Sequence, residues 1–72
     1  MKKELIGANA GTVWRALSNK HEKMTFGELL MVTQLSPIEL SAAIGWLARE
    51  DKLFFTEEDG REYIAVYHEC YY

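Results

Sequence analysis

The chain has 72 residues, of which 49% are hydrophobic and 12% aromatic, and it carries a formal net charge of −3. This length suits one small domain, predicted over residues 1–72, and the apolar content suffices for a core with apolar surface left for a partner. The acidic balance disfavours nucleic acid as the main partner, because nucleic-acid binders usually carry a basic field.

The first predicted element is a helix over residues 5–17. Four apolar residues fall on one helical face and define its buried side: Ile6, Ala10, Val13 and Leu17. Trp14 lies at the edge of this face. Gly7 and Gly11 each weaken a helix by about 1 kcal/mol relative to alanine. They predict either a later start of the helix or another backbone packed closely against it.

The second predicted element is a short helix that begins after Thr25. Thr25 and Glu28 have the spacing of a capping box, in which each side chain accepts a hydrogen bond from the other residue's backbone amide. The apolar residues of this helix are Phe26, Leu29, Leu30 and Val32. Met24 and Thr25 are predicted to form a stub strand between the first two helices.

The third predicted helix has the stronger start signal. Ser36 is a good N-cap, Pro37 suits the first helical position, and Glu39 completes a second capping box. Only residues 33–35 separate this helix from the second, which is the short link typical of a helix-turn-helix. Its predicted inward row is Leu40, Ala43, Ile44 and Leu47.

A β-hairpin is predicted at the C-terminal end. Asp59-Gly60 is a signal for a type I′ turn between two strand-like runs. If these two residues form the loop, one face carries the pairs Leu53–Val66 and Phe55–Ile64, and the other carries Phe54–Ala65 and Thr56–Tyr63. The same register sets Glu58 opposite Arg61, which is favourable, and Glu57 opposite Glu62, which is slightly unfavourable.

The element order of helix, stub strand, two helices and hairpin predicts an α+β fold, a winged helix-turn-helix with three helices and a C-terminal β-hairpin wing. The segments IGANAGTVWRAL (6–17) and AAIGWLAREDKL (42–53) resemble an uncharacterised family, a domain of unknown function, of short prokaryotic winged helix-turn-helix proteins. The most specific part is GWLARED (45–51). The resemblance implies this fold and homodimers, and it brings no catalytic residue and no cofactor.

More broadly, the chain resembles the DNA-binding domains of small transcription regulators, but it departs from them on the helix face that reads bases. At about 100° per residue, Ile38, Ala42, Gly45 and Arg49 point outward and Trp46 lies on the flank. Base edges are read by hydrogen-bonding side chains, and this face offers few. It is better suited to a protein partner, because exposed apolar anchors are typical of interface centres. The predicted protein interface is Ile38, Ala42, Gly45, Trp46 and Tyr71.

Two alternatives remain for this face. In the first, Trp46 packs against the wing and Gly45 relieves crowding within the monomer. In the second, the face reads DNA, with phosphate contacts from Arg49, Lys52 and Arg61. Neighbouring acidic residues cancel much of that positive field, so a solvated surface of mixed charge is the simpler interpretation of the cations.

The C-terminal tail holds the remaining reactive groups. His68, Glu69 and Cys70 form a triplet too short for the three or four spaced ligands of a zinc site, and it has no orienting third group for a nucleophile. We therefore predict no metal, no cofactor and no enzymatic activity. The aromatic residues Tyr67, Tyr71 and Tyr72 pack back on the first helix or cross to a second subunit.

The single Cys70 rules out a disulfide within the chain and indicates a reducing, cytoplasmic setting. No apolar run approaches the roughly 20 residues that a membrane helix needs. The sequence thus predicts a non-enzymatic winged-helix domain that dimerises and binds protein in a regulatory context. The alternative is a small DNA-binding transcriptional regulator that uses the third helix and the wing.

Overall fold

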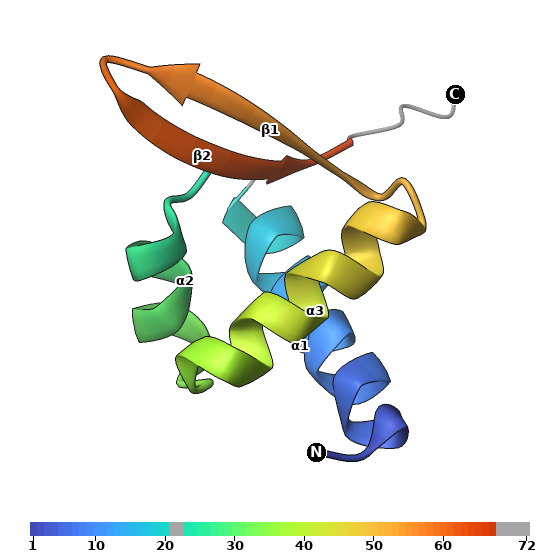
Figure 1. The fold of residues 1–72 in the computed structure, drawn as a ribbon. Coiled ribbons are helices and arrows are strands. Elements are labelled where there is room, and N and C mark those ends of the chain that lie inside the picture. Colours follow the sequence, from blue (N-terminus) through green and yellow to red (C-terminus); the bar gives the residue numbers. More distant parts are fainter. Residues whose placement is uncertain (21–22, 68–72) are drawn as a thin grey trace.

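The computed structural model describes residues 1–20 and 23–67. It contains three helices followed by an antiparallel hairpin: α1 (Lys3–Lys20), α2 (Phe26–Thr33), α3 (Pro37–Arg49), β1 (Leu53–Glu58) and β2 (Arg61–Val66). The hairpin, which we call the wing, lies across one end of the three helices (Figure 1). This arrangement confirms the predicted winged helix-turn-helix fold.

Helix α1 begins at Lys3, so its two glycines do not delay its start. The predicted inward row is confirmed at Ala10, Val13 and Leu17, which are buried, whereas Ile6 is half-buried. The edge of the Trp46 ring lies over Gly7, where a Cβ atom would be 4.0 Å from Trp46 Cζ2. The close neighbour of this helix at Gly7 is therefore a side chain of α3 and not a backbone.

Both predicted capping boxes are present, and they fix where α2 and α3 begin. Thr25 Oγ1 accepts from the Glu28 amide at 3.1 Å, and Glu28 Oε1 accepts from the Thr25 amide at 2.8 Å. The corresponding distances between Ser36 and Glu39 are 3.2 and 2.9 Å. The two helices meet at 110°, within the range of helix-turn-helix pairs.

Helix α3 ends in a Schellman motif that turns the chain into the wing. The Lys52 amide donates to the Leu47 carbonyl and the Asp51 amide donates to the Ala48 carbonyl, both at 3.0 Å. Asp51 takes the left-handed conformation of this motif, with φ of 60°. Glycine is the usual residue at this position, so an aspartate here is uncommon.

The wing has the predicted register, in which Leu53 faces Val66 and Phe55 faces Ile64. Its loop has the positive φ angles that a type I′ turn requires, 53° at Asp59 and 78° at Gly60. The stub strand is reduced to an isolated bridge at Met24, whose amide and carbonyl both bond to Ile64, at 2.9 and 2.8 Å. Thr25 does not join it because it caps α2.

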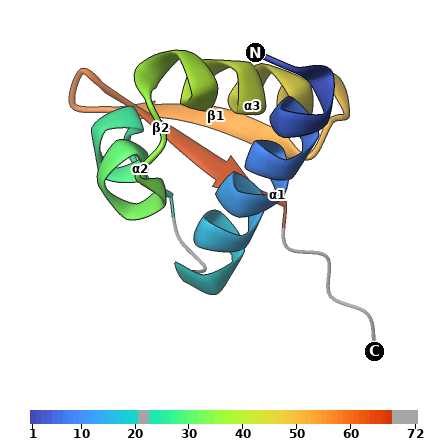
Figure 2. The ribbon, with the colours of Figure 1, turned by 90° about the horizontal axis from the view of Figure 1, so that it is seen from below.

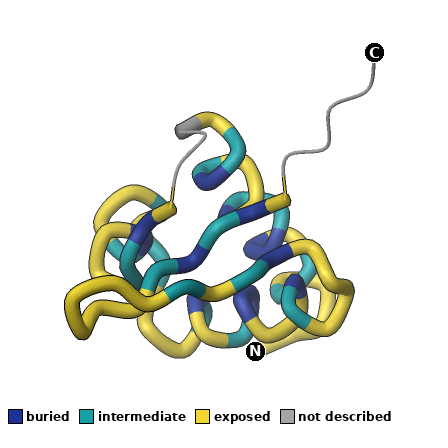
Figure 3. Tube along the Cα trace, turned by 90° about the horizontal axis from the view of Figure 1, so that it is seen from above, coloured by how far each residue is buried: buried dark blue, intermediate teal, exposed yellow. Residues whose placement is uncertain are grey.

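The core lies where the helices meet the underside of the wing. Its largest fully buried side chains are Val13, Leu17, Leu29 and Leu40. Buried segments face inward along every element, whereas the tip of the wing is exposed (Figure 3). Among the described residues, no single helix has the length and apolar composition to cross a membrane. Helices α2 and α3 have them only as a pair, and that pair is bent by 110°.

Candidate interaction face

The outward row of α3 consists of Ile38, Ala42, Gly45 and Arg49. Ile38 is 71% exposed, which is high for a large apolar side chain on a regular helix. Gly45 and Arg49 are exposed as well, and Ala42 is half-buried. A Cβ atom at Gly45 would meet no atom within 4 Å, so this glycine relieves no crowding within the monomer. That alternative is therefore wrong, and the outward row is open.

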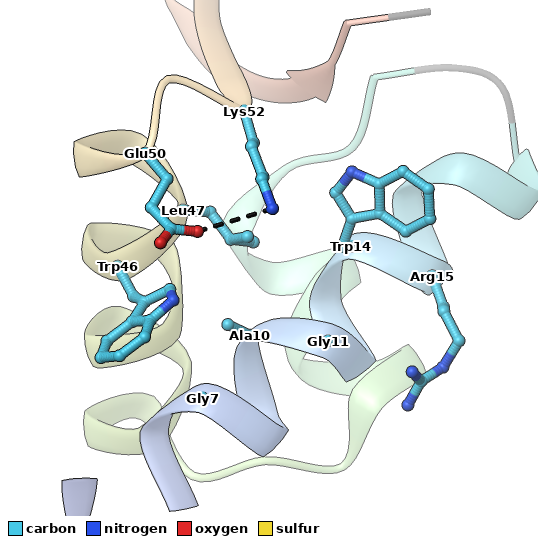
Figure 4. Close-up of a pocket in the computed structure, with 9 residues that line it drawn as sticks. All are labelled: Gly7, Ala10, Gly11, Trp14, Arg15, Trp46, Leu47, Glu50 and Lys52. Atoms are coloured by element: carbon cyan, nitrogen blue, oxygen red, sulfur yellow. Dashed lines mark ion pairs between the residues drawn. The ribbon is translucent and has the colours of Figure 1, made fainter. Parts of the chain in front are cut away.

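Trp46 lies on the flank of α3 that faces α1, beside Gly7, and not against the wing (Figure 4). The alternative that packed it on the wing is wrong, because the ring points to the opposite flank of the helix. The side chain remains 41% exposed. It is thus held in place by α1 and still presents a large apolar surface beside the outward row of α3.

A groove of about 480 Å³ follows the seam between α1 and α3. Trp14 and Trp46 stand at its two sides, over a floor that includes Gly7 and Gly11 (Figure 4). Its charged residues are Arg15, Glu50 and Lys52. We call this the α1–α3 groove.

A second groove, of about 420 Å³, lies on the other side of α3 and beneath the wing. Its lining is mainly apolar or small, with one carboxylate: Phe26, Ser41, Ile44, Gly45, Ala48, Phe55, Glu62 and Ile64. We call this the α3–wing groove. The outward row of α3 therefore lies between two concave surfaces, and together they form the candidate interaction face.

The three cations predicted to contact phosphate are not all brought together. Lys52 precedes the first residue of β1, and Arg61 lies at the opposite end of the wing, where it pairs across the strands with Glu58. Lys52 Nζ lies 3.5 Å from Glu50 Oε1, which offsets its charge. Arg49 is exposed at the end of α3, three residues before Lys52.

The wing is acidic overall. Four carboxylates surround its tip, on Glu57, Glu58, Asp59 and Glu62. Against them stand Arg61 and Lys23; the Lys23 ammonium pairs with Glu58 and lies 5.1 Å from the centre of the Tyr63 ring. The surface that would approach a DNA backbone in a winged-helix complex thus carries a net negative charge.

Two predictions concern the C-terminal tail. The ring of Tyr67 packs on Phe54 of the wing, with centroids 5.0 Å apart. Tyr71, predicted as an interface residue, lies outside the described residues, as does the triplet of residues 68–70. Within residues 1–20 and 23–67, no group of three or more potential ligands is placed to hold a metal ion.

Sequence patterns did not reveal the two grooves or the pairing of Lys23 with Glu58. These features join segments distant in sequence, so periodicity within one element carries no signal for them. Phe55 is a partial exception. It shares the predicted face of the wing with Leu53, Ile64 and Val66, which are buried, yet it is 47% exposed.

The three helices, the short turn between α2 and α3 and the hairpin define a winged helix-turn-helix domain. The chain belongs to the family described as "Winged helix-turn-helix domain (DUF2582)", a domain of unknown function whose model matches residues 1–66. This confirms the family resemblance predicted from the segments 6–17 and 42–53, of which GWLARED (45–51) is the most specific part.

Among solved structures, the chain is similar to protein BT2368 from Bacteroides thetaiotaomicron, determined by solution NMR. The two are 39% identical with a TM-score of 0.80, and the match covers 92% of this chain and 79% of that one. No curated protein matches the chain.

Proposed function

We propose that this domain is a non-enzymatic protein-interaction module that works in a regulatory, cytoplasmic context and associates through the outward row of α3. Its first partner is a second copy of the same chain. The observation that carries the proposal is the exposed apolar row, with Ile38 71% exposed, Trp46 on its flank and a groove on each side. Contiguous apolar surface of this kind marks interaction sites on small domains.

The residue types in this row support a protein partner. Trp46 is an aromatic anchor of the kind enriched in the energetic centres of interfaces. Ala42 and Gly45 are small, so they allow the backbone of another helix to approach α3 closely. The acidic wing supports the same choice, because its carboxylates would repel phosphate.

The test is the mass of the protein in solution, measured by sedimentation velocity over a wide range of concentrations. We expect a monomer–dimer equilibrium that Ala42→Glu and Trp46→Ala each shift strongly toward the monomer. Ala8→Glu is the matched control, because Ala8 is exposed on the side of α1 opposite its buried row. A wild-type protein that stays monomeric at millimolar concentration, or a dimer that both variants leave unchanged, would refute the proposal.

A DNA-binding regulator is the second candidate, favoured by one observation. The exposed side of α3 presents Arg49 and Ser41, the residue types that contact phosphate and base edges. NMR titration with mixed-sequence duplex at low salt tests it. Shifts confined to α3 and the wing that fade with salt, and that disappear in Arg49→Ala/Arg61→Ala, would support it; retained affinity in that variant would count against this placement.

A further inference from the structure

We infer that, in a pair of these chains, the N-terminal segment of one copy (residues 1–5) docks on the α3–wing groove of the other, with its lysines facing Glu57 and Glu62. The inference rests on the proposed self-association through α3. It assigns an occupant to the α3–wing groove and makes the pairing of the two copies reciprocal.

The α3–wing groove offers a predominantly apolar surface with an acidic border. Phe55 belongs to the wing face that is directed at the helices, yet nearly half of its surface is open to solvent. Ser41, Gly45 and Ala48 form the opposite wall with small side chains. An occupant with apolar side chains would therefore remove Phe55 from water without displacing a bulky neighbour.

The acidic border consists of Glu57 and Glu62. They are directly opposed across the strands and lie on the same face of the wing as Phe55 and Ile64. Like charges in this position are destabilising. Neither carboxylate takes part in the ion pairs of the described residues, which join Lys23 to Glu58 and Lys52 to Glu50. A cationic occupant would relieve this repulsion.

The N-terminal segment has the complementary chemistry. Lys2 and Lys3 are exposed, and only Glu4 opposes them, which leaves the segment with one net positive charge. Beside them, Met1 is 63% exposed and Leu5 is 45% exposed. The segment thus combines free cations with free apolar side chains, as the groove combines carboxylates with Phe55.

The positions of the N-terminal segment and the α3–wing groove allow them to meet only between two copies of the chain. Helix α3 lies between the N-terminus on one side and the wing on the other (Figure 1), and the N-terminus is level with α3 along the same edge of the molecule (Figure 2). Within one chain, α1 packs against the far flank of α3, where the Trp46 ring lies beside Gly7. A two-fold axis through the outward row of α3 brings each N-terminal segment to the partner's wing, and the interface closes after two copies.

Charge reversal tests this arrangement with the full chain in sedimentation velocity. Lys2→Glu/Lys3→Glu and Glu57→Lys/Glu62→Lys each place like charges at both contacts, so we expect each variant to raise the dimer dissociation constant by roughly tenfold or more. In an equimolar mixture, both contacts of a mixed pair join opposite charges again. We therefore expect the mixture to form heterodimers with an affinity near that of the wild type.

The matched control is Ala8→Glu/Asn19→Glu, which adds two negative charges on the exposed side of α1 opposite its buried row and leaves both contacts intact. It should dimerise like the wild type. Its heterodimer with Glu57→Lys/Glu62→Lys should be weaker than the heterodimer of the two reversals, because one of its two contacts joins like charges. Circular dichroism confirms that each variant is folded. Dimers that are lost in Ala42→Glu but unaffected by either reversal, or a mixture that stays monomeric, would overturn this inference alone. A monomeric wild type would overturn the proposed function with it.

Discussion

Asp51 occupies a backbone position that few residue types tolerate. Its φ of 60° lies in the left-handed region, where a Cβ atom crowds the following carbonyl. It also places a carboxylate directly after the C-terminal end of α3, where the helix dipole disfavours negative charge. Both effects lower the stability of the folded chain, so this position offers a stabilising substitution.

We expect Asp51→Gly to raise the free energy of unfolding by about 1 kcal/mol, because glycine takes the left-handed conformation without strain. Urea denaturation at low protein concentration measures the change. Asp51→Asn removes the charge but keeps a side chain, so it separates the electrostatic part from the conformational part. A stability below that of the wild type would show that the aspartate makes a compensating contact.

Ser36 is the residue on which the start of α3 most depends. Its hydroxyl accepts the Glu39 amide at 3.2 Å, and Ser36→Ala leaves that amide without its partner in the helix. We expect a loss of about 1 kcal/mol in the free energy of unfolding. Ser41→Ala, at an exposed position within the same helix, should leave stability unchanged or slightly higher. Equal effects of the two substitutions would contradict a specific role for the cap.

At the scale of one element, Gly45 affects the stability of α3 and the proposed association through α3 in opposite directions. Glycine within a helix lowers stability, and here the space around it is open, so nothing in the monomer requires it. Close approach of a second α3 would require it. The same residue is therefore unfavourable for the isolated helix and favourable for the proposed association.

We expect Gly45→Ala to change these two quantities in opposite directions. At concentrations where the protein is monomeric, the free energy of unfolding should rise by roughly 0.5–1 kcal/mol. In sedimentation velocity, the dimer should become weaker because the added methyl separates the helices. Gly27→Ala, with no atom closer than 4.0 Å to its Cβ position, is a control that should leave the dimer unchanged. A more stable monomer with an equally strong dimer would remove Gly45 from the interface.

The elements themselves were well predicted from the sequence because their determinants are local. A capping box depends on residues three apart, and the type I′ loop alone sets the register that places Glu57 opposite Glu62. Three other features depend on how the elements pack: the face that Trp46 contacts, the separation of Lys52 from Arg61 and the exposure of Phe55. Helical periodicity gives the direction of a side chain but not the neighbour that it meets.

At the scale of the whole molecule, the wing is tied to the helices rather than attached only through α3. Ile64 is buried in the core and exchanges two backbone hydrogen bonds with Met24, which directly precedes the cap of α2. The Met24 side chain is itself buried. Met24, just before α2, and β2 of the wing therefore stabilise each other across about 40 positions in sequence.

We expect the wing and the helices to unfold as one cooperative unit. The backbone amides of Met24 and Ile64 should exchange with solvent about as slowly as those of Leu40 and Leu47 in α3, since both groups open only in global unfolding. Native-state hydrogen exchange followed by NMR measures these rates. Fast exchange at Ile64 alongside protected amides in α3 would show that the wing opens independently.

The acidic residues of the wing have one more consequence, which concerns its free edge. In the described part of the chain, β1 pairs with β2 on one side and with no strand on the other. An unpaired edge next to Phe54 and Phe55 is a template for strand-to-strand aggregation, and charged side chains are the common means of preventing it. Glu57 and Glu58 therefore protect this edge in the isolated chain, and the lysine substitution at Glu57 retains a charge that does the same.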